Sequence, residues 1–191
     1  MNRNFGAALL AGGRSRRMGT DKAFLRFGDP PRPLWERQLE LLGSLGAEQV
    51  LLSHNVDQGF GELPPGVEPV VDSPGDCGPL GGLVSCLRRS DCERLLVLAV
   101  DVPFATREFL LGLLDHGGGV ALQDPDAGHF EAVVAVYTRD CLGIAEEQLL
   151  RGEFAMQKFI SACIVDGRLC KRTLAVGERE QLKNLNRPED L

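Results

Sequence analysis

The chain has 191 residues, of which 43% are hydrophobic and 25% charged, a mixture typical of a soluble globular domain. This composition excludes a disordered tail, a collagen-like fibre and a coiled coil. Acidic residues outnumber basic ones 27 to 21, so the net charge of −6 is opposite to that of most nucleic-acid-binding proteins. No stretch approaches the roughly 20 consecutive apolar residues of a membrane span. Neither a nucleic acid nor a membrane is therefore an expected partner.

Cysteine usage indicates a reducing compartment. An even count is compatible with a disulfide framework, but such frameworks occur mainly in small secreted domains that lack a large core. Cys86, Cys141 and Cys163 stand among apolar residues, where a free cysteine behaves as a small hydrophobe. The three histidines have no metal-like spacing with the cysteines. With no apolar leader before the first strand-like run, we expect structural thiols and a cytoplasmic protein. The six cysteines are at 77, 86, 92, 141, 163 and 170.

From residue 5 to residue 114 the sequence alternates strand-like apolar runs with segments of helical periodicity. Short apolar runs bounded by turn residues predict buried strands, whereas apolar residues three and four apart predict helices. Thr106 is placed to cap the last of these helices, and Glu108 lies favourably near the positive end of its dipole. The expected elements are a strand over 5–10, a helix over 33–45, strands over 50–52 and 67–71, a helix over 80–87, a strand over 94–100 and a helix over 106–114.

Beyond residue 115 the pattern predicts only a strand over 132–137 and a helix over 141–150. No composition shift, linker or internal repeat marks a boundary, so residues 1–191 are expected to form a single domain. The alternation predicts an α/β fold with a mostly parallel twisted sheet and helices on both faces. Ligands of such sheets bind beyond the carboxyl ends of the strands, which directs attention to 11–22, 72–82 and 101–103.

The segment after the first expected strand has the composition of an anion site. Residues 10–22 read Leu-Ala-Gly-Gly-Arg-Ser-Arg-Arg-Met-Gly-Thr-Asp-Lys, and five basic residues with one acid lie between Arg14 and Arg26. Glycines let backbone N–H groups approach an anion closely, so the segment predicts a phosphate site. It is not a Walker A loop, because Gly-Lys-Ser/Thr is absent, and it is not Gly-x-Gly-x-x-Gly. The alternative is a solvated basic loop without a ligand.

Asp101 directly follows the uncharged run from Leu95 to Val100. A carboxylate that emerges from apolar surroundings at a ligand-binding edge is costly unless it is paired, and Mg²⁺ would pair it. The alternative is that Asp101 only caps the turn before Pro103.

The segment 72–82 is rich in glycine and proline, as loops commonly are, and contains Asp72 and Asp76. Gly81 and Gly82 fall in the first turn of the expected helix. Glycine is about 1 kcal/mol less favourable than alanine inside a helix. The pair therefore indicates that another group packs closely against this backbone.

Together these segments resemble the molybdenum cofactor guanylyltransferase family of nucleotidyltransferases. Residues 10–22 are very similar to the opening signature of that family, Gly-Pro-Leu-Gly-Gly-Leu at 78–83 to its second loop, and Val-Asp-Val-Pro at 100–103 to its metal-binding turn. Residues 184–191 match its Asn-x-Asn-x-Pro-x-x-Leu ending, and the motifs fall in family order across nearly the whole chain. Related cytidylyl- and uridylyltransferases usually carry Ala-Ala-Gly where this chain has Ala11-Gly12-Gly13, which favours guanine.

The resemblance implies a Rossmann-like nucleotidyltransferase fold that transfers GMP from GTP to the terminal phosphate of molybdenum-bound molybdopterin. Mg²⁺ is the implied cofactor, and proteins that handle or insert the molybdenum cofactor are the implied transient partners. The nucleotide-binding part is expected over about 1–115 and the acceptor-binding part over about 116–191. The implied nucleotide-binding residues are Leu10, Ala11, Gly12, Gly13, Lys22, Asn55, Asp72, Gly82 and Asp101, where Asn55 substitutes for an asparagine that often directly follows the second strand. Asp101 is the implied metal ligand, and Asn184 and Asn186 are implied to face the acceptor or to complete the surroundings of the metal.

The expected chemistry agrees with these residue types. The attacking phosphate oxygen is already anionic, so no strong general base is needed. Catalysis must instead neutralise charge on the α-phosphate and on the leaving pyrophosphate while holding attacker and leaving group in line. Arg17, Lys22 and Mg²⁺ on Asp101 are the expected catalytic groups.

Two other readings remain open. The first keeps the fold and changes the substrate, to a cytidylyltransferase for the same cofactor or a transferase for a sugar or polyol phosphate. The second is a non-catalytic protein that binds GTP and delivers the cofactor, and it would bind GTP without releasing pyrophosphate. The presence of both Lys22 and Asp101 favours an enzyme, because a binding module has less use for a metal carboxylate beside the α-phosphate.

Overall fold

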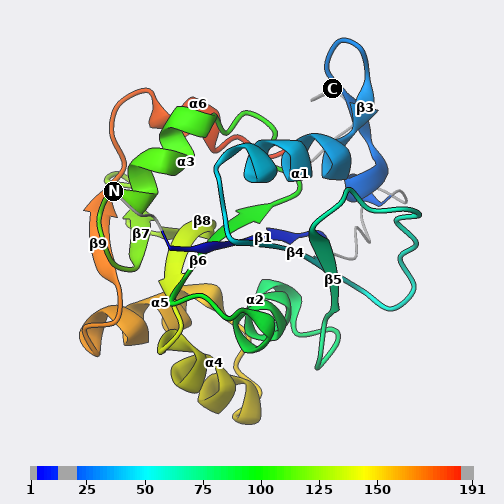
Figure 1. The fold of residues 1–191 in the computed structure, drawn as a ribbon. Helices are drawn as coiled ribbons and strands as arrows, with labels where there is room; N and C mark the ends of the chain where they lie inside the picture. Colours follow the sequence, from blue (N-terminus) through cyan, green and yellow to red (C-terminus); the bar gives the residue numbers. More distant parts are fainter. Residues whose placement is uncertain (1–3, 13–20, 186–191) are drawn as a thin grey trace.

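A seven-stranded sheet forms the centre of the computed structural model, which describes residues 4–12 and 21–185 (Figure 1). The order across the sheet is β5-β4-β1-β6-β8-β7-β9, and β8 alone among these strands is antiparallel to its neighbours. The strands are β1 (Gly6–Leu10), β4 (Gln49–His54), β5 (Val67–Val71), β6 (Arg94–Ala99), β7 (Val120–Gln123), β8 (Phe130–Thr138) and β9 (Cys170–Thr173). A separate antiparallel pair comprises β2 (Arg26–Phe27) and β3 (Arg32–Pro33).

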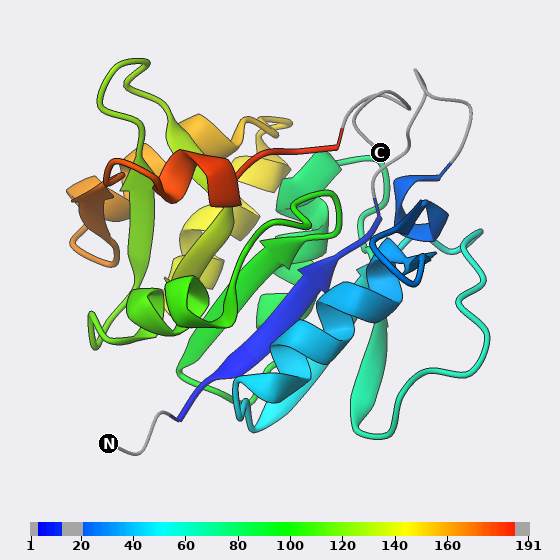
Figure 2. The same ribbon diagram turned by 90° about the horizontal axis from the view of Figure 1, so that it is seen from above.

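Helices cover both faces of the sheet (Figures 1 and 2). One face carries α1 (Leu34–Ser44), α3 (Arg107–Leu114) and the single turn α6 (Glu178–Gln181). The opposite face carries α2 (Gly78–Arg89), α4 (Cys141–Leu150) and α5 (Met156–Val165). The short 3₁₀ helix η1 (Lys22–Phe24) lies beside the first turn of α1. This arrangement confirms the predicted fold class.

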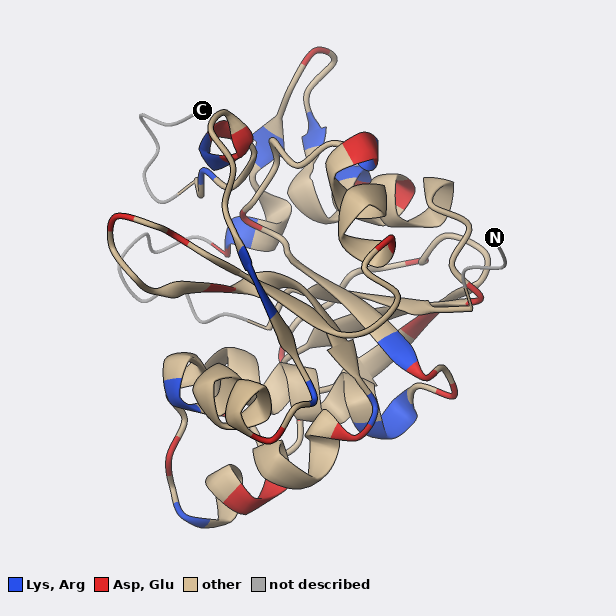
Figure 3. Ribbon diagram, turned by 90° about the vertical axis from the view of Figure 1, so that its left-hand side faces the viewer, with Lys and Arg blue, Asp and Glu red and all other residues tan. Residues whose placement is uncertain are grey.

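Burial on both faces explains why the central strands have continuous apolar sequences. Along β1, Ala7 and Leu9 belong to the core that faces α1 and α3, whereas Ala8 and Leu10 belong to the core that faces α2, α4 and α5. Side chains alternate between faces along a strand, so a strand covered on both sides must be apolar at every position. Charged residues lie mostly on helices, loops and strand ends (Figure 3).

The expected elements of the first 114 residues are all present, with bounds that agree to within two residues. Thr106 caps α3 as predicted, because its hydroxyl oxygen accepts a hydrogen bond from the backbone N–H of Phe109 at 3.3 Å. Leu34, Trp35, Leu39 and Leu42 of α1 are core residues. The helix over Cys141–Leu150 has the predicted bounds.

The second part of the chain contains four elements that the sequence analysis did not predict: β7, α5, β9 and the single turn α6. The helix α5 had a usable signal, since its buried residues Met156, Phe159, Ile160 and Cys163 recur at helical spacing. The strands β7 and β9 gave little signal in the sequence, because β7 has only four residues and β9 is a largely exposed edge strand of sequence Cys-Lys-Arg-Thr.

All six cysteines are free thiols, and every one except Cys170 is buried. Cys86, Cys141 and Cys163 are fully buried in the core between the sheet and α2, α4 and α5, which confirms their expected structural role. Burial raises the pKa of the Cys86 thiol well above its usual range, so this thiol stays protonated. No helix in the described part of the chain is long and apolar enough to cross a membrane.

Candidate active site

The carboxyl ends of β1, β4, β5 and β6 meet at one edge of the sheet, where η1 also lies (Figure 2). Backbone hydrogen bonds continue past the strand ends and hold the following residues together. Ala11 N–H donates to the Ser53 carbonyl at 2.9 Å, and Val100 N–H donates to the Leu10 carbonyl at 3.1 Å. The three segments singled out by the sequence, 11–22, 72–82 and 101–103, therefore all begin at this edge, as the parallel sheet predicts.

Lys22 and Asp101 form an ion pair at this edge. Lys22 Nζ lies 2.8 Å from Asp101 Oδ2, and the two side chains are only 20% and 19% exposed. Asp21 positions the lysine: its carboxylate accepts a hydrogen bond from Ala23 N–H at 3.0 Å and so caps η1, which begins at Lys22. Two residues that are 79 positions apart in the sequence thus bring a cation and a carboxylate to the predicted phosphate and metal site.

The carboxylate of Asp72 lies among three small residues: Gly12 after β1, Ser53 on β4 and Gly82 on α2. Ser53 Oγ, which is fully buried, donates to Asp72 Oδ1 at 2.5 Å. A Cβ atom added to Gly12 would lie 2.0 Å from Asp72 Oδ2, and one added to Gly82 would lie 2.5 Å from Ser53 Oγ. Only glycine at both positions leaves room for this arrangement. The close packing that the Gly81-Gly82 pair predicts is confirmed, since a Cβ on Gly81 would lie 2.9 Å from the Pro74 carbonyl oxygen.

Burial raises the pKa of Asp72, because a desolvated carboxylate is less stable as an anion. The hydrogen bond from Ser53 and the charge of His54 act in the opposite direction and offset part of this rise. A half-buried carboxylate with a raised pKa beside a glycine-lined edge is typical of a ligand site.

Two amide side chains hold the backbone that follows β1. Asn55 Nδ2 donates to the Gly12 carbonyl, and Gln58 Nε2 donates to the Ala11 carbonyl at 2.9 Å. Asn55, which we expect to replace an asparagine of the family, therefore contacts the predicted nucleotide-binding loop. Sequence analysis missed Ser53 and Gln58. A polar residue that ends the apolar run of β4 was a signal for Ser53, but nothing in the sequence singled out Gln58.

The remaining predicted residues fall into three groups. Leu10 and Ala11 are buried, at 8% and 1% exposure, so only their backbone atoms are available to a ligand at this edge. Asn184 is exposed and precedes Leu185, whose N–H donates to the Asp101 carbonyl at 2.9 Å, so the C-terminal segment passes the site. Gly13, Arg17 and Asn186 lie outside the described residues.

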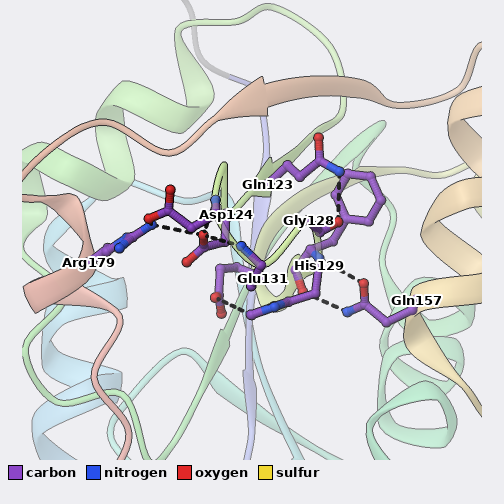
Figure 4. Close-up of polar contacts among 10 residues, drawn as sticks. Gln123, Asp124, Gly128, His129, Glu131, Gln157 and Arg179 are labelled. Atoms are coloured by element: carbon purple, nitrogen blue, oxygen red, sulfur yellow. Dashed lines mark hydrogen bonds and ion pairs between the residues drawn. The ribbon is translucent and has the colours of Figure 1, made fainter.

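A second polar cluster closes the β7–β8 hairpin in the predicted acceptor part (Figure 4). Arg179 approaches Asp124 at 2.9 Å, and Gln123 Nε2 donates to the Gly128 carbonyl at 2.8 Å. Backbone N–H groups of Ala127 and Asp126 and the charge of Arg179 hold the pKa of Asp124 below its usual range. Because most of these side chains are exposed and already paired with one another, the cluster fixes the loop and is not itself evidence of a ligand site.

Comparisons with known proteins agree with this geometry. The sequence pattern of the MobA-like NTP transferase domain matches residues 7–167. The chain belongs to that family. A protein of Opitutus terrae named probable molybdenum cofactor guanylyltransferase is 35% identical over 96% of this chain and 91% of that protein. A molybdenum cofactor guanylyltransferase of Xanthomonas euvesicatoria is 33% identical over 99% of this chain and 93% of that protein.

Among solved structures, molybdopterin-guanine dinucleotide biosynthesis protein A from Archaeoglobus fulgidus superposes with a TM-score of 0.73. It is 21% identical and covers 97% of this chain and 94% of that structure, so the likeness establishes the fold. This MobA-like chain is accordingly an enzyme, a nucleotidyltransferase. Its expected division into a nucleotide part and an acceptor part stays a prediction.

Proposed function

We propose that this MobA-like enzyme transfers GMP from GTP to the terminal phosphate of molybdenum-bound molybdopterin in the cytoplasm. In this reaction an acceptor phosphate oxygen attacks the α-phosphorus of GTP, and the bond from that phosphorus to the bridging oxygen breaks, so pyrophosphate leaves. The observation that carries the proposal is the Lys22–Asp101 ion pair. It lies at the same sheet edge as the Asp72 carboxylate and the two glycines, Gly12 and Gly82, that leave room for it. The names of the relatives support guanine as the base and molybdopterin as the acceptor.

The donor set at the edge suits Mg²⁺ that binds together with a nucleotide. Mg²⁺ is usually held by one or two carboxylates plus substrate phosphates, with water completing its shell. In the described ranges no group of three or more His, Cys, Asp or Glu residues has metal-binding geometry, so no protein cage is built there. Asp101 is the carboxylate that would hold the ion. When bound, Mg²⁺ supplies positive charge to the α-phosphate and to the departing pyrophosphate.

The protein groups would contribute charge and orientation. Lys22, fixed on η1 by the Asp21 cap, can exchange its contact with Asp101 for a contact with the phosphates when nucleotide and metal arrive. Backbone N–H groups after β1 would approach the phosphates, as they do in other glycine-containing anion sites. Asp72 would accept hydrogen bonds from donors of the nucleoside, because an ionised carboxylate is a hydrogen-bond acceptor. None of these groups needs to remove a proton from the attacking phosphate.

Pyrophosphate release tests the proposal directly. The protein is mixed with Mg²⁺, molybdenum-bound molybdopterin and one of GTP, CTP or UTP, and pyrophosphate is measured over time. We expect release with GTP that depends on the acceptor. Release with CTP would retain the fold and the chemistry but overturn guanine as the base. GTP binding without release, from folded protein, would support the reading as a binding protein and overturn the proposed activity.

A further inference from the structure

Every hydrogen-bonding group of the Gln58 side chain has a partner at the candidate active site. Its Oε1 accepts a hydrogen bond from Asn55 N–H at 2.7 Å, while its Nε2 donates to the Ala11 carbonyl at 2.9 Å and to Asp21 Oδ2 at 2.5 Å. A glutamine amide has two N–H donors and one carbonyl acceptor, and here each has a partner. The bond to Asp21 is to a charged group, which makes it one of the stronger kinds.

These partners lie on segments that carry the nucleotide site. Ala11 directly follows β1, and its carbonyl is fixed by Gln58 while the next carbonyl, that of Gly12, is fixed by Asn55. In a trans peptide the carbonyl and the following N–H point in opposite directions. Holding the Ala11 carbonyl against Gln58 therefore directs the N–H of Gly12 away from Gln58.

The second partner connects Gln58 to the ion pair. Asp21 uses one carboxylate oxygen for Gln58 and the other for the N–H of Ala23, so the cap of η1 is itself held in place. Lys22 begins η1 and lies 2.8 Å from Asp101. A continuous series of polar contacts thus runs from Gln58 through Asp21 to the turn that presents Lys22.

We propose that Gln58 is a positioning residue of the nucleotide site, which acts through its two amide donors by orienting the Gly12 backbone and the Lys22 turn together. The proposal deepens the function proposed above and rests on it for the identity of the nucleotide. Gln58 needs no contact with the substrate. Its effect is to keep the two anion-binding parts of the site in one fixed relation, so that binding does not have to order them.

Two variants separate the donors from the rest of the side chain. Gln58→Glu keeps the length and the acceptor for Asn55 N–H but removes both donors and places a carboxylate beside Asp21. Gln58→Met keeps the length and removes all polar contacts. If the donors are what matters, both variants raise the KM for GTP about tenfold, equivalent to about 1.4 kcal/mol, with a smaller change in kcat and none in the KM for the acceptor. A Gln58→Glu enzyme with wild-type KM for GTP would overturn the proposal.

Gln49 offers a matched control at the start of β4, the strand that precedes Gln58, and so at the opposite edge of the sheet. It too uses both ends of its amide, donating to Glu68 Oε1 at 3.1 Å and accepting from Asp91 N–H at 3.2 Å. Gln49→Met should therefore remove a comparable number of hydrogen bonds and leave the KM for GTP unchanged. An equal rise in KM in this control would show that the Gln58 effect is only a loss of general stability.

A double-mutant cycle and hydrogen exchange complete the test. In an Asp21→Ala background, adding Gln58→Met should raise the KM for GTP by clearly less than tenfold, because part of the contact is already gone. Backbone amides of residues 21–27 should exchange about tenfold faster in Gln58→Glu than in the wild type, while those of residues 130–138 do not change. The exchange result does not depend on turnover. If the wild type releases no pyrophosphate, the proposed function fails while exchange still decides the role of Gln58, and unchanged exchange at 21–27 would refute it.

Discussion

Replacing Gly82 by alanine tests the packing of the Asp72 carboxylate most directly. In an ordinary helix interior this change stabilises by about 1 kcal/mol. At Gly82 the added Cβ would lie 2.5 Å from Ser53 Oγ and 3.4 and 3.5 Å from the two Asp72 carboxylate oxygens. Overpacking of this kind costs about 1–3 kcal/mol, and loss of a hydrogen bond to a charged group costs about 1.5–3 kcal/mol. We therefore expect Gly82→Ala to destabilise the protein by about 2 kcal/mol.

The assay is thermal unfolding of Gly82→Ala beside a control in which the new methyl group meets open space. Gly112 lies inside α3 with no heavy atom within 4 Å of its added Cβ, so Gly112→Ala should be stabilising. For a chain of this size 1 kcal/mol changes Tm by about 2–4 °C. Gly82→Ala should lower Tm by about 4–8 °C, and Gly112→Ala should raise it by about 2–4 °C.

A second background identifies the atom responsible. Ser53→Ala removes the hydroxyl that the new methyl group would meet, so Gly82→Ala should cost less stability in that background than alone. Nucleotide binding should weaken in Gly82→Ala, because the displaced hydroxyl no longer orients Asp72. If Gly82→Ala raised Tm as Gly112→Ala does, the glycine would be dispensable for packing and the account of the Asp72 site would be wrong.

Three further substitutions test the charged groups. Asp101→Asn should lower the transfer rate by at least about 100-fold while Tm falls by only a few degrees, and an enzyme with near-normal turnover would remove Asp101 from the metal site. Lys22→Met should raise the Kd for GTP and slow transfer together, which titration calorimetry and pyrophosphate release check; unchanged values would contradict its phosphate role. Because burial raises the pKa of Asp72, the folded state binds that proton more tightly than the unfolded state, so wild-type stability gains as pH falls through the raised pKa toward the ordinary value. Asp72→Asn should therefore raise Tm at pH 7, and this advantage over the wild type should disappear on acidification. Urea unfolding at several pH values measures the difference in stability. If the stabilities of the wild type and the variant changed in parallel with pH, the expected pH dependence would be wrong.

Much of the nucleotide half could be predicted because its signals are local. The strands β1 and β6 are apolar throughout, and α1 and α2 have apolar residues at helical spacing, so each element is visible in a short window of sequence. Glycines at 81 and 82 indicated close packing before the contact was known. The second half was harder to predict because edge strands such as β9 are stabilised by a neighbouring strand and not by their own residues.

The sequence by itself determined the α/β class, the parallel arrangement of the first strands and the sheet edge at which Lys22, Asp72 and Asp101 lie. Periodicity and turn residues suffice for that, since the carboxyl ends of parallel strands must share an edge. The antiparallel β8, the Lys22–Asp101 pair and the seat of Asp72 between Gly12 and Gly82 were decided only by the tertiary structure. The tertiary structure also decided the place of Gln58, whose side-chain hydrogen bonds to Ala11 and Asp21 span 47 and 37 residues of sequence. Contacts between residues so distant in the chain arise only when the sheet order brings their loops together, and no local pattern encodes that order.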